Sequence, residues 1–407
     1  MPVKLNTIPA PARRPEKPVS RRWLKWLTGL IIAGSLFSWF SGQPTRSPGF
    51  WLFAIALPAS LWLIAAWARG MIYFLGHIQA NAWDRSREEL ILKEVRRGRR
   101  ALQILQGTFI TAHTSIRKRF SVPSSEALVQ NKNALRTQND WKGNSVRHSR
   151  LTVSPDTSPD TFLSQIFADL LPELAVSLKQ YPDNQRVALL FESDTSVSRE
   201  RVCDLWHAAW QQSDIRQSPE EIDAHGLAAI DHWLDSRIKE NTLLLVIALQ
   251  VATASPENTG EAVAALLLGN RMTQNVLTPY ALMHRPEPGK PQTLVTNITQ
   301  ALDWKPLLPE DLHHLWQAGL SKDGRQAVSD LNGRPPLQGV EMSSTQYDLD
   351  NTLGHTGSVA PWLAIAAAAQ AVQEMQEDHL VVSGEQGDEM IWSTVVSPYQ
   401  SVKEKMK

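Results

Sequence analysis

The sequence predicts an α/β protein in which an N-terminal two-helix transmembrane hairpin precedes a layered α/β domain. Two long apolar stretches near the N-terminus predict the hairpin. Beyond residue 160, short apolar runs alternate with stretches of helical periodicity, a pattern typical of strands interleaved with helices. The single cysteine, Cys203, excludes an internal disulfide and a Cys-rich zinc site, and the 43% apolar content excludes wholesale disorder.

The charges are segregated along the chain although the formal net charge of the 407 residues is zero. Residues 1–150 hold 24 Lys/Arg and 7 Asp/Glu, a net charge of +17. Residues 151–407 hold 17 Lys/Arg and 34 Asp/Glu, a net charge of −17. This asymmetry predicts that the basic front part of the chain meets a charged surface.

Residues 23–68 are predicted to form the transmembrane hairpin. Trp23 to Phe40 is mostly apolar and Phe50 to Ala68 is uncharged, so each is close to the roughly 20 residues that cross about 30 Å of hydrocarbon. Pro58 inside the second span is tolerated at the cost of a kink. A cleaved signal peptide is the alternative, but a second span follows at once and no clear small-x-small cleavage site is present.

Basic residues flank both predicted spans, whereas the connecting turn holds only Arg46. The positive-inside rule therefore places both ends in the cytoplasm, with residues 1–22 as a cytoplasmic basic tail and residues 69–120 as a basic juxtamembrane helical segment. Within that segment, residues 83–106 read as an amphipathic helix whose Arg-rich face either lies on anionic lipid or is solvated. Nucleic-acid binding is disfavoured because no aromatic stacking platform accompanies these charges.

Residues 121–160 are expected to form a linker and residues 161–407 the α/β domain. Helices are expected at residues 161–180, 198–212, 219–239, 309–318 and 361–375. Strands are expected at residues 186–192, 242–252, 262–269, 294–298, 380–382 and 390–396. The runs at 242–252 and 262–269 suit central strands covered on both faces, and the last two strands flank a Gly-Glu-Gln-Gly turn as a terminal hairpin.

Three stretches, in this order, carry a resemblance to a known fold. They are LLLVIALQVA (243–252) followed by GEAVAALLLGN (260–270), then DNTLGHTGSVAPWLAIAAAAQAV (350–372), then the terminal hairpin. Together they resemble the thiolase-like fold and, within it, the β-ketoacyl synthases (condensing enzymes), over about residues 160–407. The resemblance implies a five-layered sandwich, and it implies a nucleophilic cysteine at a strand-to-helix turn with two histidines and a lysine around it.

The departures from this family determine the expected function. His355 matches the Gly-His-Thr histidine, but Asp350 stands where the lysine is expected, which reverses the charge. The DAHG sequence at 223–226 looks like the motif of the second histidine but precedes its strand, so it is interpreted as coincidence. Cys203 lies within a helical pattern beside Trp206 and not at a Gly/Ser-rich turn, which predicts a small core residue and a domain without the condensing chemistry.

A catalytic site remains conceivable only if Cys203 pairs with His207, one helical turn away, or with His355. No P-loop, Gly-x-Gly-x-x-Gly or Gly-x-Ser-x-Gly motif is present, so no cofactor is predicted. His313 and His314 lie next to two acidic residues, but adjacent helical residues point to different sides. A solvated surface is therefore expected there, and no metal site is predicted.

A membrane hairpin, a basic collar and a non-catalytic thiolase-like domain together resemble the type VI secretion lipase-adaptor family of Gram-negative bacteria. The resemblance implies a multi-pass inner-membrane protein whose large domain faces the cytoplasm, binds a lipase-like effector protein and passes it to the secretion spike protein. The alternative function is a membrane-associated acyl-transfer enzyme of the condensing type. A third is a structural membrane component of a secretion assembly. The sequence leaves the oligomeric state open.

Overall fold

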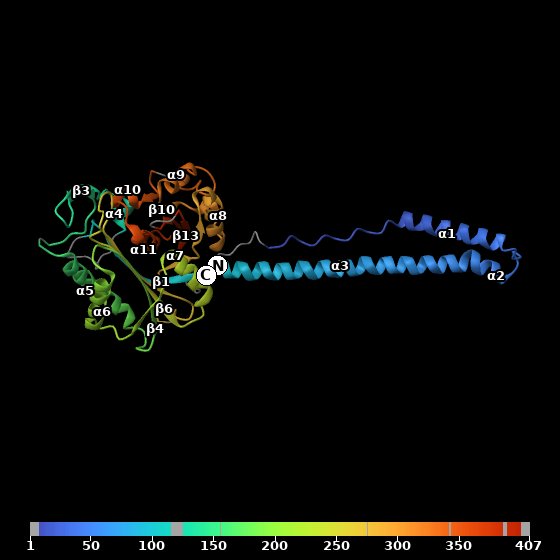
Figure 1. Ribbon diagram of the computed structural model, residues 1–407, viewed down its shortest axis with the longest axis horizontal. Helices are drawn as coiled ribbons and strands as arrows, with labels where there is room; N and C mark the ends of the chain where they lie inside the picture. The colour runs from blue at the N-terminus through green and yellow to red at the C-terminus, as the bar shows by residue number, and fades with distance from the viewer. Residues whose placement is uncertain are drawn as a thin grey trace. The chain divides into compact units, whose positions relative to one another are not determined.

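The computed structural model describes residues 8–114, 125–154, 156–274, 276–341, 343–385 and 389–399 (Figure 1). The chain divides into two compact units, one covering Lys4–Val95 and the other Arg96–Lys407 with the first three residues. Residues 386 and 387 of the predicted Gly-Glu-Gln-Gly turn lie outside the described residues.

The first unit is helical. It contains α1 (Ser20–Phe40), α2 (Pro48–Trp51), the π-helical turn η2 (Leu52–Ala56) and α3 (Leu57–Gly98), whose last turn belongs to the second unit. Helix α1 and the continuous helical stretch Pro48–Gly98 are long and apolar enough to cross a membrane. The π-turn lies directly before Pro58, which cannot donate a backbone hydrogen bond, and such turns relieve this loss.

Small residues bring α1 close to the following helices. A Cβ added at Gly34 would lie 2.7 Å from the backbone oxygen of Phe53, and the Trp62 Nε1 donates to the Trp23 carbonyl oxygen at 2.8 Å. Many large apolar side chains of these helices are exposed. At least half-exposed are Leu24, Trp26, Ile32, Phe37, Trp39, Phe40, Trp51, Leu61, Leu63, Ile64 and Trp67. An exposed apolar surface of this extent is unusual in a water-soluble protein.

One large mixed sheet organises the second unit, in the strand order β11-β10-β12-β13-β8-β1-β7-β6-β4-β5, with β9 pairing to β13. Its strands are β1 (Ala101–Ile110), β4 (Arg186–Asp194), β5 (Pro219–Glu221), β6 (Thr242–Gln250), β7 (Ala262–Gly269), β8 (Ala281–His284), β9 (Glu287–Gly289), β10 (His314–Ala318), β11 (Gln346–Asp348), β12 (His379–Gly384) and β13 (Ile391–Pro398).

The sheet consists of two halves with the same topology. The first half contains β1, β4, β5, β6 and β7, and the second contains β8, β10, β11, β12 and β13. If the strands of each half are numbered 1 to 5 along the chain, both halves have the spatial order 3-2-4-5-1. In each half the fifth strand runs antiparallel to both of its neighbours, whereas the second, third and fourth are parallel. The unit is therefore an internal repeat of one five-stranded motif.

Helices separate and cover the two half-sheets (Figure 1). Helices α7 (Gly226–Ser236) and α11 (Ala360–Met375) contribute to the central apolar cluster, which receives residues from both halves. Helices α5 (Pro159–Leu178) and α6 (Arg199–Gln212) cover the first half, and α8 (Leu294–Trp304) and α9 (Lys322–Asp330) cover the second. These five layers confirm the predicted layered α/β fold. Helix α5 also has the length and composition of a membrane span, but its apolar face is buried in this core.

Alternation along the strands shows why the layers form. In β6, Leu244, Val246 and Ala248 face the central cluster, whereas Leu243 and Leu245 face the layer of α5 and α6. All nine β6 residues are buried. The continuous apolar run predicted at 242–252 thus serves two cores at once, as expected for a strand covered on both faces.

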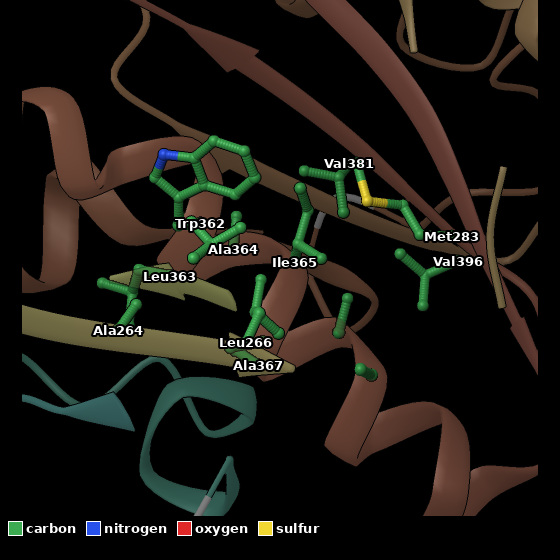
Figure 2. Packing of buried hydrophobic residues seen from close by; sticks show 14 of the residues in the cluster. Ala264, Leu266, Met283, Trp362, Leu363, Ala364, Ile365, Ala367, Val381 and Val396 are labelled. Carbon is green, nitrogen blue, oxygen red and sulfur yellow. The ribbon is translucent and has the colours of Figure 1, made fainter. Parts of the chain in front are cut away.

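Helix α11 is the most completely buried element of the unit. Thirteen of its sixteen residues are buried, and seven of them are alanines. Figure 2 shows side chains from both half-sheets converging on it. They include Ala264, Leu266, Met283, Val381 and Val396. Small side chains on α11 allow this close approach on both sides.

The predicted juxtamembrane helix is wrong in its second half. Helix α3 ends at Gly98, and Ala101–Ile110 form β1, so Leu102 and Leu105 are buried strand residues. A Cβ at Gly98 would overlap the ring of Trp304, which shows how closely the helix end packs on α8. Pairing with β7 and β8 on both edges outweighs the local helical periodicity.

Two further regions differ from the predictions. Residues 121–160 contain α4 (Glu126–Val129) and a hairpin of β2 (Arg136–Asn139) and β3 (Ser145–His148) where a linker was expected. The predicted helix 219–239 is β5 followed by α7.

In the second half-sheet, one predicted strand is a helix and one predicted helix is a strand. The predicted strand 294–298 opens helix α8, whose buried residues Leu294, Ile298 and Leu302 have helical spacing. The predicted helix 309–318 is a 3-10 turn followed by β10, whose five residues are all buried between parallel neighbours. Short apolar runs do not distinguish a buried strand from a buried helix.

Candidate functional site

The two central helices begin at one cavity of about 430 Å³ in the second unit. Its lining includes His225 and Gly226 at the start of α7, Ser358 and Pro361 at the start of α11, and the carboxylate residues Glu192 and Glu385. Elements distant in the sequence meet here because each half-sheet delivers one central helix to the middle layer.

The entrance to α7 is held by two carboxylates. Gly226, in the left-handed region at φ +56°, donates its N–H to the Glu192 Oε1 at 2.6 Å, and Leu227 donates its N–H to the Glu385 Oε1 at 2.9 Å. The Trp362 Nε1 donates to the other Glu192 oxygen at 2.9 Å. Burial raises the pKa of the Glu192 carboxyl, and these hydrogen bonds partly oppose that shift. The first amides of α7 are therefore already occupied by the protein's own side chains.

His355 lies in the loop that leads into α11. Its carbonyl oxygen accepts from the Gly260 N–H at 3.0 Å and from the Gln250 Nε2 at 2.8 Å, which fixes the loop against β6 and β7. The His355 Nδ1 lies 3.7 Å from Asp350, and the imidazole side chain is 40% exposed. The Asp350 carboxylate raises the pKa of His355, and burial opposes this shift.

Asp350 is a structural connector. On the short helix α10 (Leu349–Leu353), its carboxylate accepts from the N–H groups of Gly319 and Leu320 at 2.9 and 3.0 Å. The side chain is buried. The acidic residue found where the resemblance implies a lysine thus joins the end of β10 to the loop of His355.

Cys203 and His207 lie elsewhere, on the outer helix α6. Cys203 is partly buried, and burial together with the nearby Glu221 raises the pKa of its thiol, which disfavours a thiolate. The His207 Nε2 lies 3.6 Å from the Glu221 carboxylate. Among the described residues, no hydrogen bond joins Cys203 to His207, and neither residue lines the cavity. The structure does not bring Cys203 together with His355.

The 223–226 sequence, interpreted as a coincidental match to a motif, contributes two residues to the cavity. His225 and Gly226 lie in the cavity wall on the same side of the molecule as the start of α11. The sequence reasoning missed them because it required this motif to follow the 262–269 strand. A glycine that opens an apolar helix (GLAAI) was the available signal. No sequence feature around Glu192 or Glu385 indicated that these residues line a cavity.

The expectation for the adjacent histidines holds for His313, which is exposed, but not for His314, which is 8% exposed. His314 stacks on His379 with ring centroids 4.3 Å apart, and its Nδ1 lies 3.0 Å from the Tyr347 hydroxyl. His314 is the first residue of strand β10, and His313 directly precedes the strand. Across the described ranges, no group of three or more His, Cys, Asp or Glu side chains is arranged to hold a metal ion.

No protein-family profile matches the sequence, and no curated protein matches it. Solved ketosynthase structures do match the fold. The ishigamide ketosynthase/chain length factor has a TM-score of 0.52 and 12% identity, covering 74% of this chain and 100% of that one. A type II polyketide acyl-carrier protein in complex with its ketosynthase bound to the hexaketide gives 0.51 and 8%, covering 74% and 99%.

A third match is the PfaC keto synthase–chain length factor, with a TM-score of 0.50 and 11% identity, covering 74% of this chain. This chain spans 43% of the length of that protein. The second unit has the layered α/β fold of thiolase-like ketosynthases. At these identities the likeness establishes the fold alone.

The Asp350–His355 pair predicts a defined pH dependence. Because Asp350 raises the pKa of His355 in the folded state, the pair stabilises the fold below the ordinary histidine pKa. That contribution is lost as the pH rises through the folded-state pKa. We expect Asp350→Asn to move the NMR titration of the His355 ring to lower pH, with Asp204→Asn on exposed α6 as the matched control. An unchanged titration in Asp350→Asn would contradict this assignment.

Gly226 offers a second prediction, with Gly333 as its control. Both have positive φ (+56° and +65°), but a Cβ at 333 meets open space, whereas a Cβ at 226 would overlap the Glu385 carboxylate. We expect Gly333→Ala to lower the free energy of unfolding by about 1–2 kcal/mol. Gly226→Ala should cost about 1–3 kcal/mol more, because the buried Leu227 N–H loses its acceptor.

Chemical unfolding of the full chain in detergent measures both glycine variants. Combining Gly226→Ala with Glu385→Ala should show strong non-additivity, because the overlap and the hydrogen bond disappear together. Equal losses at positions 226 and 333 would show that Glu385 does not constrain the entrance to α7.

Proposed function

We propose that this protein is a membrane-anchored adaptor whose ketosynthase-like unit binds another protein and does not condense acyl groups. The observation that supports this most directly is the entrance to α7, where Gly226 and two carboxylates occupy the strand-to-helix turn at the cavity. A condensing mechanism requires a nucleophile at such a turn, and none of the residues given as lining the cavity is a cysteine.

The electrostatics of the cavity favour the same conclusion. Acyl condensation develops negative charge, which enzymes stabilise with hydrogen-bond donors and positive groups. Here Glu192 and Glu385 accept hydrogen bonds from the first two α7 amides. These two carboxylates would oppose a developing oxyanion, and these two amides, which could stabilise it, already have acceptors.

The membrane assignment is part of the proposal. Residues 23–68 are expected to form the hairpin in the bacterial inner membrane, with the large unit in the cytoplasm. The outward apolar side chains of α1 and α3 and the basic flanks of the two spans support it. In water this apolar surface would have no partner.

The secretion role rests on the layout of the chain. A basic anchored segment followed by a non-catalytic thiolase-like unit resembles the type VI secretion lipase adaptors, so the proposed partners are a lipase-like effector and the spike protein. The folded unit from Arg96 onward holds 29 Lys/Arg and 36 Asp/Glu, a net charge of −7. This charge favours encounter with a basic partner, although less strongly than the value of −17 for residues 151–407.

The second candidate is a membrane-associated condensing enzyme. The fold likeness favours it, as does the position of His355 in the loop that leads into α11. It would require Cys203 to act with His207 or His355, and Cys203 lies on outer helix α6.

Thioester turnover tests the choice between these functions. The full chain in detergent should show no condensation or hydrolysis of acyl and malonyl thioesters above the protein-free rate. A ketosynthase of known structure, assayed in parallel, serves as the positive control. Cys203→Ala and His355→Ala should behave as the unmodified chain does. Turnover that either substitution abolishes, with folding intact, would establish the enzyme and overturn the adaptor.

Secretion of the effector tests the role itself. In a bacterium that carries this gene, its deletion should abolish secretion of the lipase-like effector while leaving secretion of the spike protein intact. Complementation with Cys203→Ala should restore export fully. Loss of both proteins would instead indicate a structural component of the assembly, and unaffected effector secretion would refute the adaptor role.

A further inference from the structure

The first unit contains a groove of about 310 Å³ between the start of α1 and the middle of α3. Besides Pro18 and Ser20, its lining consists of two tryptophans, a leucine, two small residues of α3 and one cation. These residues are Trp23, Leu24, Trp62, Ala66, Gly70 and Arg69. All of them lie within residues 18–70, so the groove belongs to the hairpin alone.

The groove has a fixed shape. The Trp62 Nε1 donates to the Trp23 carbonyl oxygen at 2.8 Å, which holds the two helices in register. At Gly70 an added Cβ would meet nothing within 4 Å, so the absence of a side chain there leaves open space. An extended apolar chain fits along such walls.

Arg69 is the only charged residue in the lining of the groove. It follows the uncharged stretch 50–68, and among the described residues it has no hydrogen-bond or ion-pair partner. Arg21 and Arg22 add positive charge in the first turn of α1, whose start also lines the groove. Glu16 is the nearest carboxylate in the sequence. The site therefore has uncompensated positive charge beside an apolar wall.

These features match the two parts of one amphiphile. A guanidinium pairs with phosphate through charge-assisted hydrogen bonds, and the end of an uncharged span lies near the headgroup level of a bilayer. Tryptophans are preferred at this depth.

We infer that this groove binds one anionic phospholipid, with its phosphate on Arg69 and an acyl chain along Trp62, Ala66 and Leu24. The inference rests on the proposed membrane anchoring and adds to it a specific lipid partner. The bound lipid would fix the spacing of the two helices at their cytoplasmic end.

Native mass spectrometry of the full chain, extracted from vesicles of phosphatidylglycerol and phosphatidylcholine in mild detergent, tests the site. The unmodified chain should retain one phosphatidylglycerol in preference to phosphatidylcholine. Arg69→Gln should lower that retention at least five-fold by removing the charge. Gly70→Leu should do the same by filling the groove, and it keeps a good helix former at that position. Arg85→Gln, on the exposed face of the same helix, is the matched control and should retain the lipid.

Equal retention in Arg69→Gln and the unmodified chain, or equal retention of the two lipids, would overturn the site. Competition by inorganic phosphate at millimolar concentration, with no dependence on the acyl chains, would also overturn it by identifying a free-phosphate site. Alkaline carbonate extraction of the same membranes separates the two proposals. Release of the unmodified chain would refute membrane anchoring, whereas an embedded chain without retained lipid would refute only the groove.

Discussion

The second unit depends on the burial of α11 between two half-sheets. A helix can lie against sheets on both sides only if its side chains leave room for both, and the alanines from Ala364 to Ala371 provide that room. Larger residues of the helix, such as Trp362 and Ile365, fill the spaces that remain. Because β6 and β7 each serve two apolar clusters, the close packing of this one helix determines the spacing of all five layers.

This packing also creates the cavity. Helices α7 and α11 begin in the same region because each follows the third strand of its own half-sheet. In a catalytic protein of this fold, such a place would hold a nucleophile. In this chain Glu192 accepts hydrogen bonds from Gly226 and Trp362 and so links α7 to α11. The carboxylates at the site are thus explained by the folded structure without invoking a reaction.

Asp350 also has a structural role. Its carboxylate accepts two backbone hydrogen bonds beyond β10 and lies near His355, so it links the loop after β10 to the loop that leads into α11. A buried carboxylate with these donors is satisfied, whereas a lysine could not accept them. The charge reversal noted in the sequence is therefore part of a different hydrogen-bond network.

By itself the sequence determined the elements whose signal is local: the apolar helices of the first unit, helices α5, α6 and α11, and the buried pair β6 and β7. Length, periodicity and Ser caps specify these segments without reference to distant residues. Only the tertiary structure decided that residues 101–110 pair in mid-sheet, that 294–304 form a helix and 314–318 a strand, and that His225 and Gly226 share a cavity with the start of α11. A short buried run is compatible with helix or strand, and the partners that decide between them lie more than a hundred residues away, as β7 does from β1.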